Sequence, residues 1–445
     1  MLINKFLRIS KLKFLLKCDI IYQIKITGDK TIKMKNNAER KKIENAYKDL
    51  QHYYLKNEDR VIGLDDKPFY NLLELLYPLF SENPYYSDDC LVSALSAYVR
   101  RKNSVDDDLN ELIEYINTIF DINKEKHFLV FPLQGSGLKR DIFFSSFYLI
   151  KEKDENDIIK QMSEITNIDI QTVRDFLRHT QQSRSKDFLK SNIMIIEVEN
   201  QTENVNRLAY QSAQFSVDIF KLMHSAFGIK SSIFRMGEIW GKENSHVAIL
   251  SKDNWRQGYG FSWKAQLQCK IDLDFMENKE NQELFCSLFD KITKSKSDSL
   301  TNKFINAFML YGKATVQKSK YRDADLALLL YITAVGSLLT EGFNEKRLRI
   351  SAIVPRLIDY KDKSVSEVSK NLERLYLSRN NFLHAGQSSF LTRRDDEMEF
   401  LDRVTALVLL KCFELDETIP VNGEKRTSLW TKYIDGIFKN IIFGM

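Results

Sequence analysis

The sequence predicts a mainly α-helical protein with a small mixed α/β region in its middle. The 445 residues include only 16 Gly and 6 Pro, too few for a chain built of many strands and tight turns. Apolar residues recur at intervals of three and four over long stretches at both ends, as in amphipathic helices. Between these stretches lie shorter apolar runs rich in β-branched and aromatic residues, which predict strands. A chain of this length exceeds one ordinary domain, so we expect two or three.

Residues 34–125 are expected to form an N-terminal helical region. Three apolar stripes at helical spacing follow one another: Leu72, Leu73, Leu76, Leu79 and Phe80, then Leu91, Leu95 and Tyr98, then Leu109, Leu112, Ile113, Ile116 and Ile119. Each stripe gives one helix a face to bury against the others.

Residues 1–33 form a basic leader with eight Lys/Arg against two Asp, whereas the formal net charge of the whole chain is only +5. The other 412 residues therefore sum to −1, and the chain as a whole is not a basic protein. Lysines interrupt the apolar residues of the leader, so it lacks the continuous core of a secretory signal. Two interpretations stay open: a basic amphipathic segment at a membrane surface, or, as we favour, a stretch preceding a native start at Met34.

No run of 18 apolar residues occurs, so the sequence predicts no transmembrane helix and no stable membrane insertion. The five cysteines are scattered and include no Cys-x-x-Cys pair. Free thiols of this kind are typical of a reducing compartment, and we expect a cytoplasmic protein without a metal site.

Residues 126–270 are expected to form the mixed α/β region. Strands are predicted at 127–133 and 141–151, and the Gly135-Ser136-Gly137 segment between them is interpreted as a hairpin turn. A further strand at 193–199 precedes a long helix, 203–227, that ends at Gly228. Short strands are then predicted at 231–236, 246–250 and 259–263, with a turn at 251–255.

Residues 271–445 are again expected to be helical. The polar stretch 294–303 interrupts the periodicity and is interpreted as a loop. The segment from Asp325 to Thr340 is apolar on nearly all sides, which is typical of the central helix of a bundle.

One helix in this region has an unusual residue pattern. Ser364 and Glu367 have the spacing of a capping box and predict its first turn. A seam of Val365, Val368, Leu372 and Leu375 follows at steps of three and four, and the next positions of the seam are Arg379 and Phe382. A guanidinium in such a seam needs a partner or a ligand, because burying an unpaired charge is costly. His384 lies near the predicted helix end, where Gly386 suits a C-cap. The alternative is an arginine that extends its stem along the bundle, beside an incidental histidine.

The sequence at the end of this helix resembles the Arg-x4–6-His motif of HEPN domains. It reads Leu-Tyr-Leu-Ser-Arg-Asn-Asn-Phe-Leu-His-Ala-Gly. The Apea-like branch is most similar, since there a tyrosine precedes the arginine and a glycine follows the histidine. The resemblance covers about residues 300–416 and includes the apolar helix and a helix at 350–359. Relatives often carry an acid in the apolar helix; here Gly336 occupies the comparable place, and Glu341 and Glu373 are nearby acids.

The resemblance implies a C-terminal HEPN-like helical bundle within residues 271–445. It also implies an endoribonuclease that needs no metal or cofactor, acting as a toxin in anti-phage (abortive infection) defence. Arg379, His384 and Asn380 are the implied catalytic residues, RNA the substrate, and a homodimer the active form. A phage-derived trigger or regulatory partner is expected to control it. The alternative is a non-catalytic module in which Arg379 binds RNA, a nucleotide or a partner protein.

Overall fold

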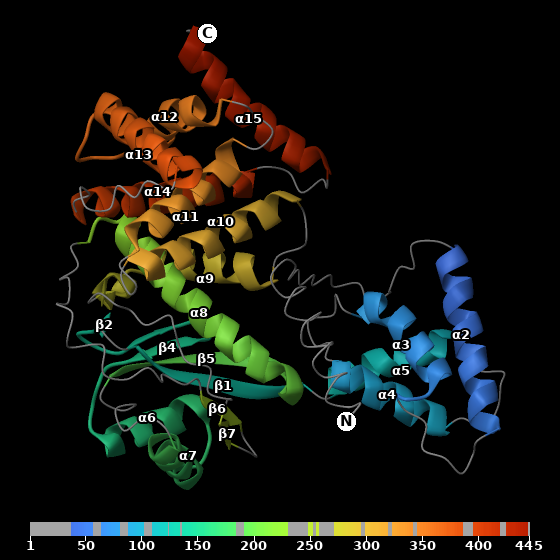
Figure 1. Cartoon of the computed structure of the whole chain (residues 1–445). Helices are drawn as coiled ribbons and strands as arrows, with labels where there is room; N and C mark the ends of the chain where they lie inside the picture. Colours follow the sequence, from blue (N-terminus) through green and yellow to red (C-terminus); the bar gives the residue numbers. More distant parts are fainter. Residues whose placement is uncertain are drawn as a thin grey trace. The chain divides into compact units, whose positions relative to one another are not determined.

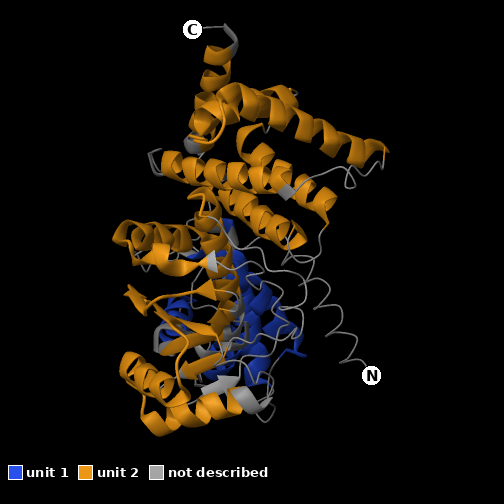
Figure 2. Cartoon of the chain, turned by 90° about the vertical axis from the view of Figure 1, so that its left-hand side faces the viewer, with its two compact units in different colours: residues 1–123, 293–297 blue, residues 124–292, 298–445 orange. Residues whose placement is uncertain are grey.

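The computed structural model describes residues 37–56, 64–80, 88–101, 109–122, 124–133, 136–183, 191–229, 248–251, 255–257, 271–294, 299–318, 323–340, 345–385, 395–418 and 424–443. These residues are mainly helical and include a small antiparallel sheet, as the sequence predicts. The chain divides into two compact units, residues 1–123 with 293–297, and residues 124–292 with 298–445 (Figure 2).

The first unit contains four described helices: α2 (Asn37–Leu55), α3 (Lys67–Phe80), α4 (Asp88–Arg101) and α5 (Leu109–Ile122). The predicted apolar stripes supply most of its core. The buried members are Leu72, Leu76, Phe80, Leu91, Leu95, Tyr98, Leu109, Leu112 and Ile116. The expected N-terminal helices are therefore confirmed.

The second unit begins with a six-stranded antiparallel sheet in the order β3-β4-β5-β1-β6-β7 (Figure 1). Its strands are β1 (Lys124–Leu133), β3 (Ile142–Phe144), β4 (Phe147–Ile150), β5 (Asn192–Gln201), β6 (Ala248–Ser251) and β7 (Trp255–Gln257). Two very short strands, β2 (Ser136–Gly137) and β8 (Ile271–Asp272), pair in parallel as a separate ladder. The predicted strands at 231–236 and 259–263 lie outside the described residues.

The hairpin expected around Gly135–Gly137 is wrong. β1 pairs with β5 and β6 instead of with the next segment, and Ser136–Gly137 form β2. The 141–151 segment folds back on itself as the β3–β4 hairpin, with Ser145 at φ 51° in its turn. The Ser-Ser pair thus supplies the turn, and β1 is left free for the longer pairing with β5.

Both faces of the sheet are covered by helices, so its central strand is buried on both sides (Figure 1). Leu129 and Phe131 of β1 join the core that includes α8 (Thr202–Ala226). Phe128 and Val130 point the other way and pack with α6 (Glu155–Thr166) and α7 (Ile170–Ser183). The predicted long helix ending at Gly228 is confirmed as α8, and Gly228 has a φ of +65°.

After β8 and a 3-10 helix, η1 (Leu273–Glu277), the described chain is helical to its end. The helices are α9 (Lys279–Lys294), α10 (Ser299–Val316), α11 (Ala324–Leu339), α12 (Lys346–Leu357), α13 (Val365–Ala385), α14 (Asp395–Thr418) and α15 (Glu424–Phe443). The bounds of the loop expected over 294–303 are wrong, since α9 includes Lys294 and α10 begins at Ser299, and residues 295–298 lie outside the described residues. Leu300 and Phe304 of α10 are buried, and their packing outweighs the polar residues around them.

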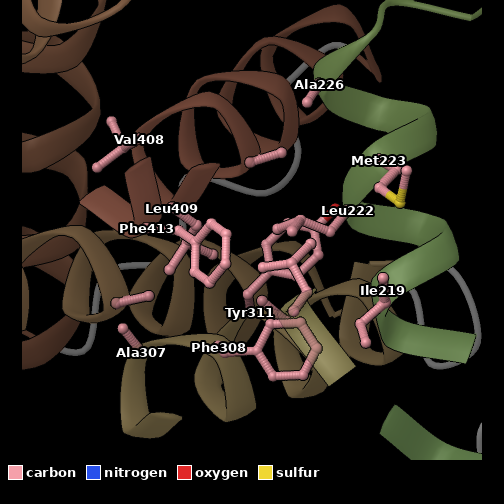
Figure 3. Close-up of a cluster of buried hydrophobic side chains, with 14 of the residues drawn as sticks. Ile219, Leu222, Met223, Ala226, Ala307, Phe308, Tyr311, Val408, Leu409 and Phe413 are labelled. Atoms are coloured by element: carbon pink, nitrogen blue, oxygen red, sulfur yellow. The ribbon is translucent and has the colours of Figure 1, made fainter. Parts of the chain in front are cut away.

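The apolar helix α11 lies in the interior of the bundle, as predicted, and contacts α10, α12, α13 and α14. Its start is fixed by Asp323, whose side chain accepts a hydrogen bond from the Leu326 backbone N–H. One hydrophobic core joins these helices to α8 and the sheet. Figure 3 shows the part of this core where α8, α10 and α14 meet. The expected domain boundary at residue 270 stays a prediction, and this core runs across it. Within the described ranges, no helix combines the length and hydropathy that crossing a membrane requires.

Candidate functional site

The start of α13 is the predicted capping box. The Glu367 N–H donates to Ser364 Oγ at 3.3 Å, and the Ser364 N–H donates to Glu367 Oε2 at 2.8 Å. These hydrogen bonds satisfy two N–H groups at the helix start and fix where α13 begins. The Ser364 hydroxyl also donates to Glu367, and these bonds lower the pKa of the Glu367 carboxyl.

The buried face of α13 agrees with the predicted seam from its second turn onward. Val368, Leu372 and Leu375 are buried, but Val365 is 47% exposed. Val365 is therefore wrongly placed in the seam. It is the first residue of the helix, and α13 buries side chains only from its second turn onward.

Arg379 continues this face and is half-buried. Its Nη1 donates to Asn380 Oδ1 at 3.0 Å, and its Cζ lies 5.6 Å from the centre of the Tyr376 ring. Its Nε is buried and has no hydrogen-bond partner within the described part of the chain. The guanidinium is thus held by an amide and an aromatic ring, neither of which neutralises its charge.

His384 lies in the last turn of α13 and is exposed. It follows Arg379 by five residues, which on a regular helix corresponds to about 140° of rotation. The two side chains therefore leave α13 in different directions, and the structure does not bring them together. Asn380 precedes His384 by four residues and shares its face. The expected C-cap, Gly386, lies outside the described residues.

The segment of the chain that carries Arg379 has a positive formal charge. Residues 345–385, which span α12 and α13, contain nine Lys/Arg and five Asp/Glu, a net charge of +4. Residues 34–445 together sum to −1, so positive charge is concentrated on this pair of helices. Such a concentration attracts polyanions.

The acids considered near the site lie apart from Arg379. Glu373 is exposed on α13, and its Oε1 is 3.8 Å from Nε of Arg347 on α12. A Cβ atom at Gly336 would make ordinary contacts, with Ile350 Cδ1 at 3.8 Å. Glu341 lies outside the described residues. The buried acid of the apolar helix is Asp325, in its first turn.

The predicted site residues did not include Tyr376, although its ring contacts the Arg379 guanidinium. The sequence indicates this contact only through the spacing of three residues between Tyr376 and Arg379, because side chains at that spacing meet on a helix. Within the described residues, no three His, Cys, Asp or Glu side chains lie close enough together to hold a metal ion.

No protein-family model, curated protein or solved structure matches this chain.

Proposed function

We propose that this protein is a metal-independent endoribonuclease of the HEPN type that acts as a toxin in anti-phage defence. The observation that carries the proposal is the environment of Arg379. Its guanidinium is half-buried toward the C-terminal end of α13, on a pair of helices with a positive formal charge, without a carboxylate contact among the described residues. A cation kept in this way suits a phosphate group.

The reaction follows from the chemistry of RNA. The 2′-hydroxyl loses its proton to a base and attacks the adjacent phosphorus, forming the new P–O2′ bond. The P–O5′ bond then breaks, and the leaving oxygen takes up a proton. The products end in a 2′,3′-cyclic phosphate and a 5′-hydroxyl.

His384 is the proton-transfer group in this proposal, because imidazole serves as acid or base near neutral pH. Arg379 stabilises the negative charge that develops on the phosphorane. Asn380 is bonded to Arg379 and shares the face of His384, so it orients the guanidinium relative to the imidazole.

The angle between Arg379 and His384 favours a site completed by a second chain. One helix directs the two groups apart, so Arg379 and His384 of the same chain do not face one substrate. A two-fold homodimer that pairs two α13 ends supplies two of each group. A phage-derived trigger or regulatory partner is proposed to control access to this site.

The test uses the purified full chain and 5′-labelled RNA in EDTA. We expect cleavage, products with 2′,3′-cyclic phosphate ends, and no cleavage where the scissile nucleotide is 2′-deoxy. His384→Ala and Arg379→Ala should abolish cleavage, and Arg379→Lys should not restore it, because an ammonium lacks the planar fork. Arg178→Ala and His179→Ala on α7 are the controls and should cleave normally. Expression of His384→Ala should also relieve growth arrest and RNA loss in cells.

A second candidate is a binding module without catalysis, favoured by the separate directions of Arg379 and His384. In that case His384→Ala binds RNA or a nucleotide as the unchanged protein does, and Arg379→Ala does not. Cleavage that depends on a divalent metal, or that persists in His384→Ala, contradicts the nuclease assignment.

A further inference from the structure

A single arginine joins the end of α8 to the segment that leads into α13. Arg403 lies on α14, and its side chain is 22% exposed. On one side its guanidinium rests against Gly228, just beyond the end of α8. A Cβ atom at Gly228 would lie 2.7 Å from Arg403 Nη2 and 2.9 Å from its Cζ. Gly228 suits this position by its φ of +65°, and a side chain there would displace the Arg403 guanidinium.

The last turn of α8 is a suitable place for a cation. The Gly228 N–H donates to the Ser225 carbonyl at 3.1 Å, and the Ile229 N–H donates to the His224 carbonyl at 3.3 Å. These bonds close the turn at its negative end, where a guanidinium is favourable.

On its other side Arg403 holds the α12–α13 connection. Its Nη1 donates to Asp362, and its Cζ lies 4.9 Å from the centre of the Tyr360 ring. Tyr360 also packs against Phe400 of α14, with ring centres 5.4 Å apart. Asp362 lies two residues before the Ser364 cap, so this contact fixes the entry to α13.

We propose that Arg403 couples the C-terminal end of α8 energetically to the start of α13. α8 packs along the sheet and α13 carries Arg379 and His384, so a partner that displaces the end of α8 alters the entry to the candidate site. The planar guanidinium suits this role because one rigid group meets a helix end, a carboxylate and an aromatic ring. The inference does not rest on the proposed function, since the coupling is a property of the fold.

Hydrogen exchange on the full chain tests the coupling. Asp362→Asn removes the ion pair and should speed exchange of the amides in 360–368 about three- to fivefold, the loss expected of a partly exposed pair. Gly228→Ala displaces Arg403 from the other side and should speed exchange of the same amides, although residue 228 lies far from them in sequence. In the double variant, Asp362→Asn should hardly increase the exchange rate further, because Gly228→Ala has already broken the Arg403–Asp362 contact.

Two further variants make the result decisive. Arg403→Gln should speed exchange both at 224–229 and at 360–368, and it should abolish the effect of Gly228→Ala on 360–368. Asn167→Ala is the matched control, since Asn167 also has a left-handed φ of 54° but ends α6. It should leave 360–368 unchanged. The proposal would be overturned if Gly228→Ala and Asp362→Asn changed the exchange rates of 360–368 additively. It would also be overturned if Gly228→Ala left those rates unchanged.

Discussion

Asp218 shows how tightly single residues fit where α8 meets α10. Its carboxyl is buried and accepts a hydrogen bond from Gln214 Nε2 at 2.8 Å, and Lys221 Nζ lies 3.5 Å away. Burial raises the pKa of Asp218, and the nearby Lys221 charge opposes the shift. The carboxylate has room only because residue 312 of α10 lacks a side chain. A Cβ atom there would lie 2.4 Å from Asp218 Oδ2.

Gly312→Ala should therefore destabilise the protein by about 1–3 kcal/mol, because the new methyl group pushes a buried carboxylate away from its partners. The free energy of unfolding from denaturant titration measures this. Gly436→Ala in α15 is the matched control, since nothing lies within 4 Å of the added Cβ. That change should stabilise the protein by about 0.5–1 kcal/mol, as helix propensity alone predicts. Equal effects of the two substitutions would contradict the close fit at Asp218.

His224 should make stability depend on pH. Burial lowers its pKa below the ordinary 6.5, Asp402 and Asp272 act in the opposite direction, and Lys318 adds to the lowering. The unfolded chain therefore binds a proton near pH 6.5, whereas the folded chain does so only at lower pH. Between those two pKa values the unfolded state holds more protons, so stability falls as pH falls.

The measurement is the free energy of unfolding from about pH 7.5 to about pH 5.5. In His224→Gln the free energy of unfolding should fall less toward low pH, because no buried imidazole has to be protonated. His52→Gln, which changes an exposed histidine, should show the same slope as the unchanged protein. A slope in His224→Gln equal to that of the unchanged protein would show that another group causes the dependence.

Among the elements, α13 depends on its first turn for a defined start. Ser364→Ala removes the side-chain acceptor for the Glu367 N–H and should cost about 0.5–2 kcal/mol of stability. Ser366→Ala, two residues further along the exposed start of the helix, should change stability by less than about 0.5 kcal/mol. Hydrogen exchange of the first turn distinguishes a local from a global effect. Protection that is equal in both variants would argue against the cap.

The same helix shows what a sequence pattern can predict. The capping box, the buried seam from Val368 and the place of His384 near the helix end all follow from local spacing. The partners of Arg379 were harder to predict, because a seam position calls for an apolar residue and gives no sign of which group meets the guanidinium. Whether Arg379 and His384 form one site is not a local property, since the helix directs them apart.

The sequence pattern does not indicate which strands of the sheet pair when they lie far apart in the chain. The strand at 127–133 was recognisable, whereas the single strand predicted at 141–151 is the β3–β4 hairpin. β1 pairs with β5, about 70 residues later in the chain, and not with its neighbour. α6 and α7 were not predicted either. Their apolar faces complete a core only against one face of the finished sheet.

At the scale of the whole second unit, α8 connects the sheet with the helical bundle. One cluster of buried side chains includes Leu222 and Met223 of α8, Phe308 and Tyr311 of α10, and Leu409 of α14 (Figure 3). Because this apolar core is continuous, we expect the sheet and the bundle to unfold cooperatively.

The last prediction concerns assembly, because the proposed site takes groups from two chains. Arg379→Ala and His384→Ala chains should each be inactive as homodimers. When they are unfolded together and refolded, about half of the dimers are mixed, and each mixed dimer contains one site with both groups intact. RNA cleavage should then return to about a quarter of the normal rate. The control is the same mixture without unfolding, which should stay inactive while subunits do not exchange. Cleavage by a monomer at full rate, or a refolded mixture with no activity, would place Arg379 and His384 of one chain in the same site or remove them from catalysis. In either case the two-chain site fails, while the fold of α13 and its cap are unaffected.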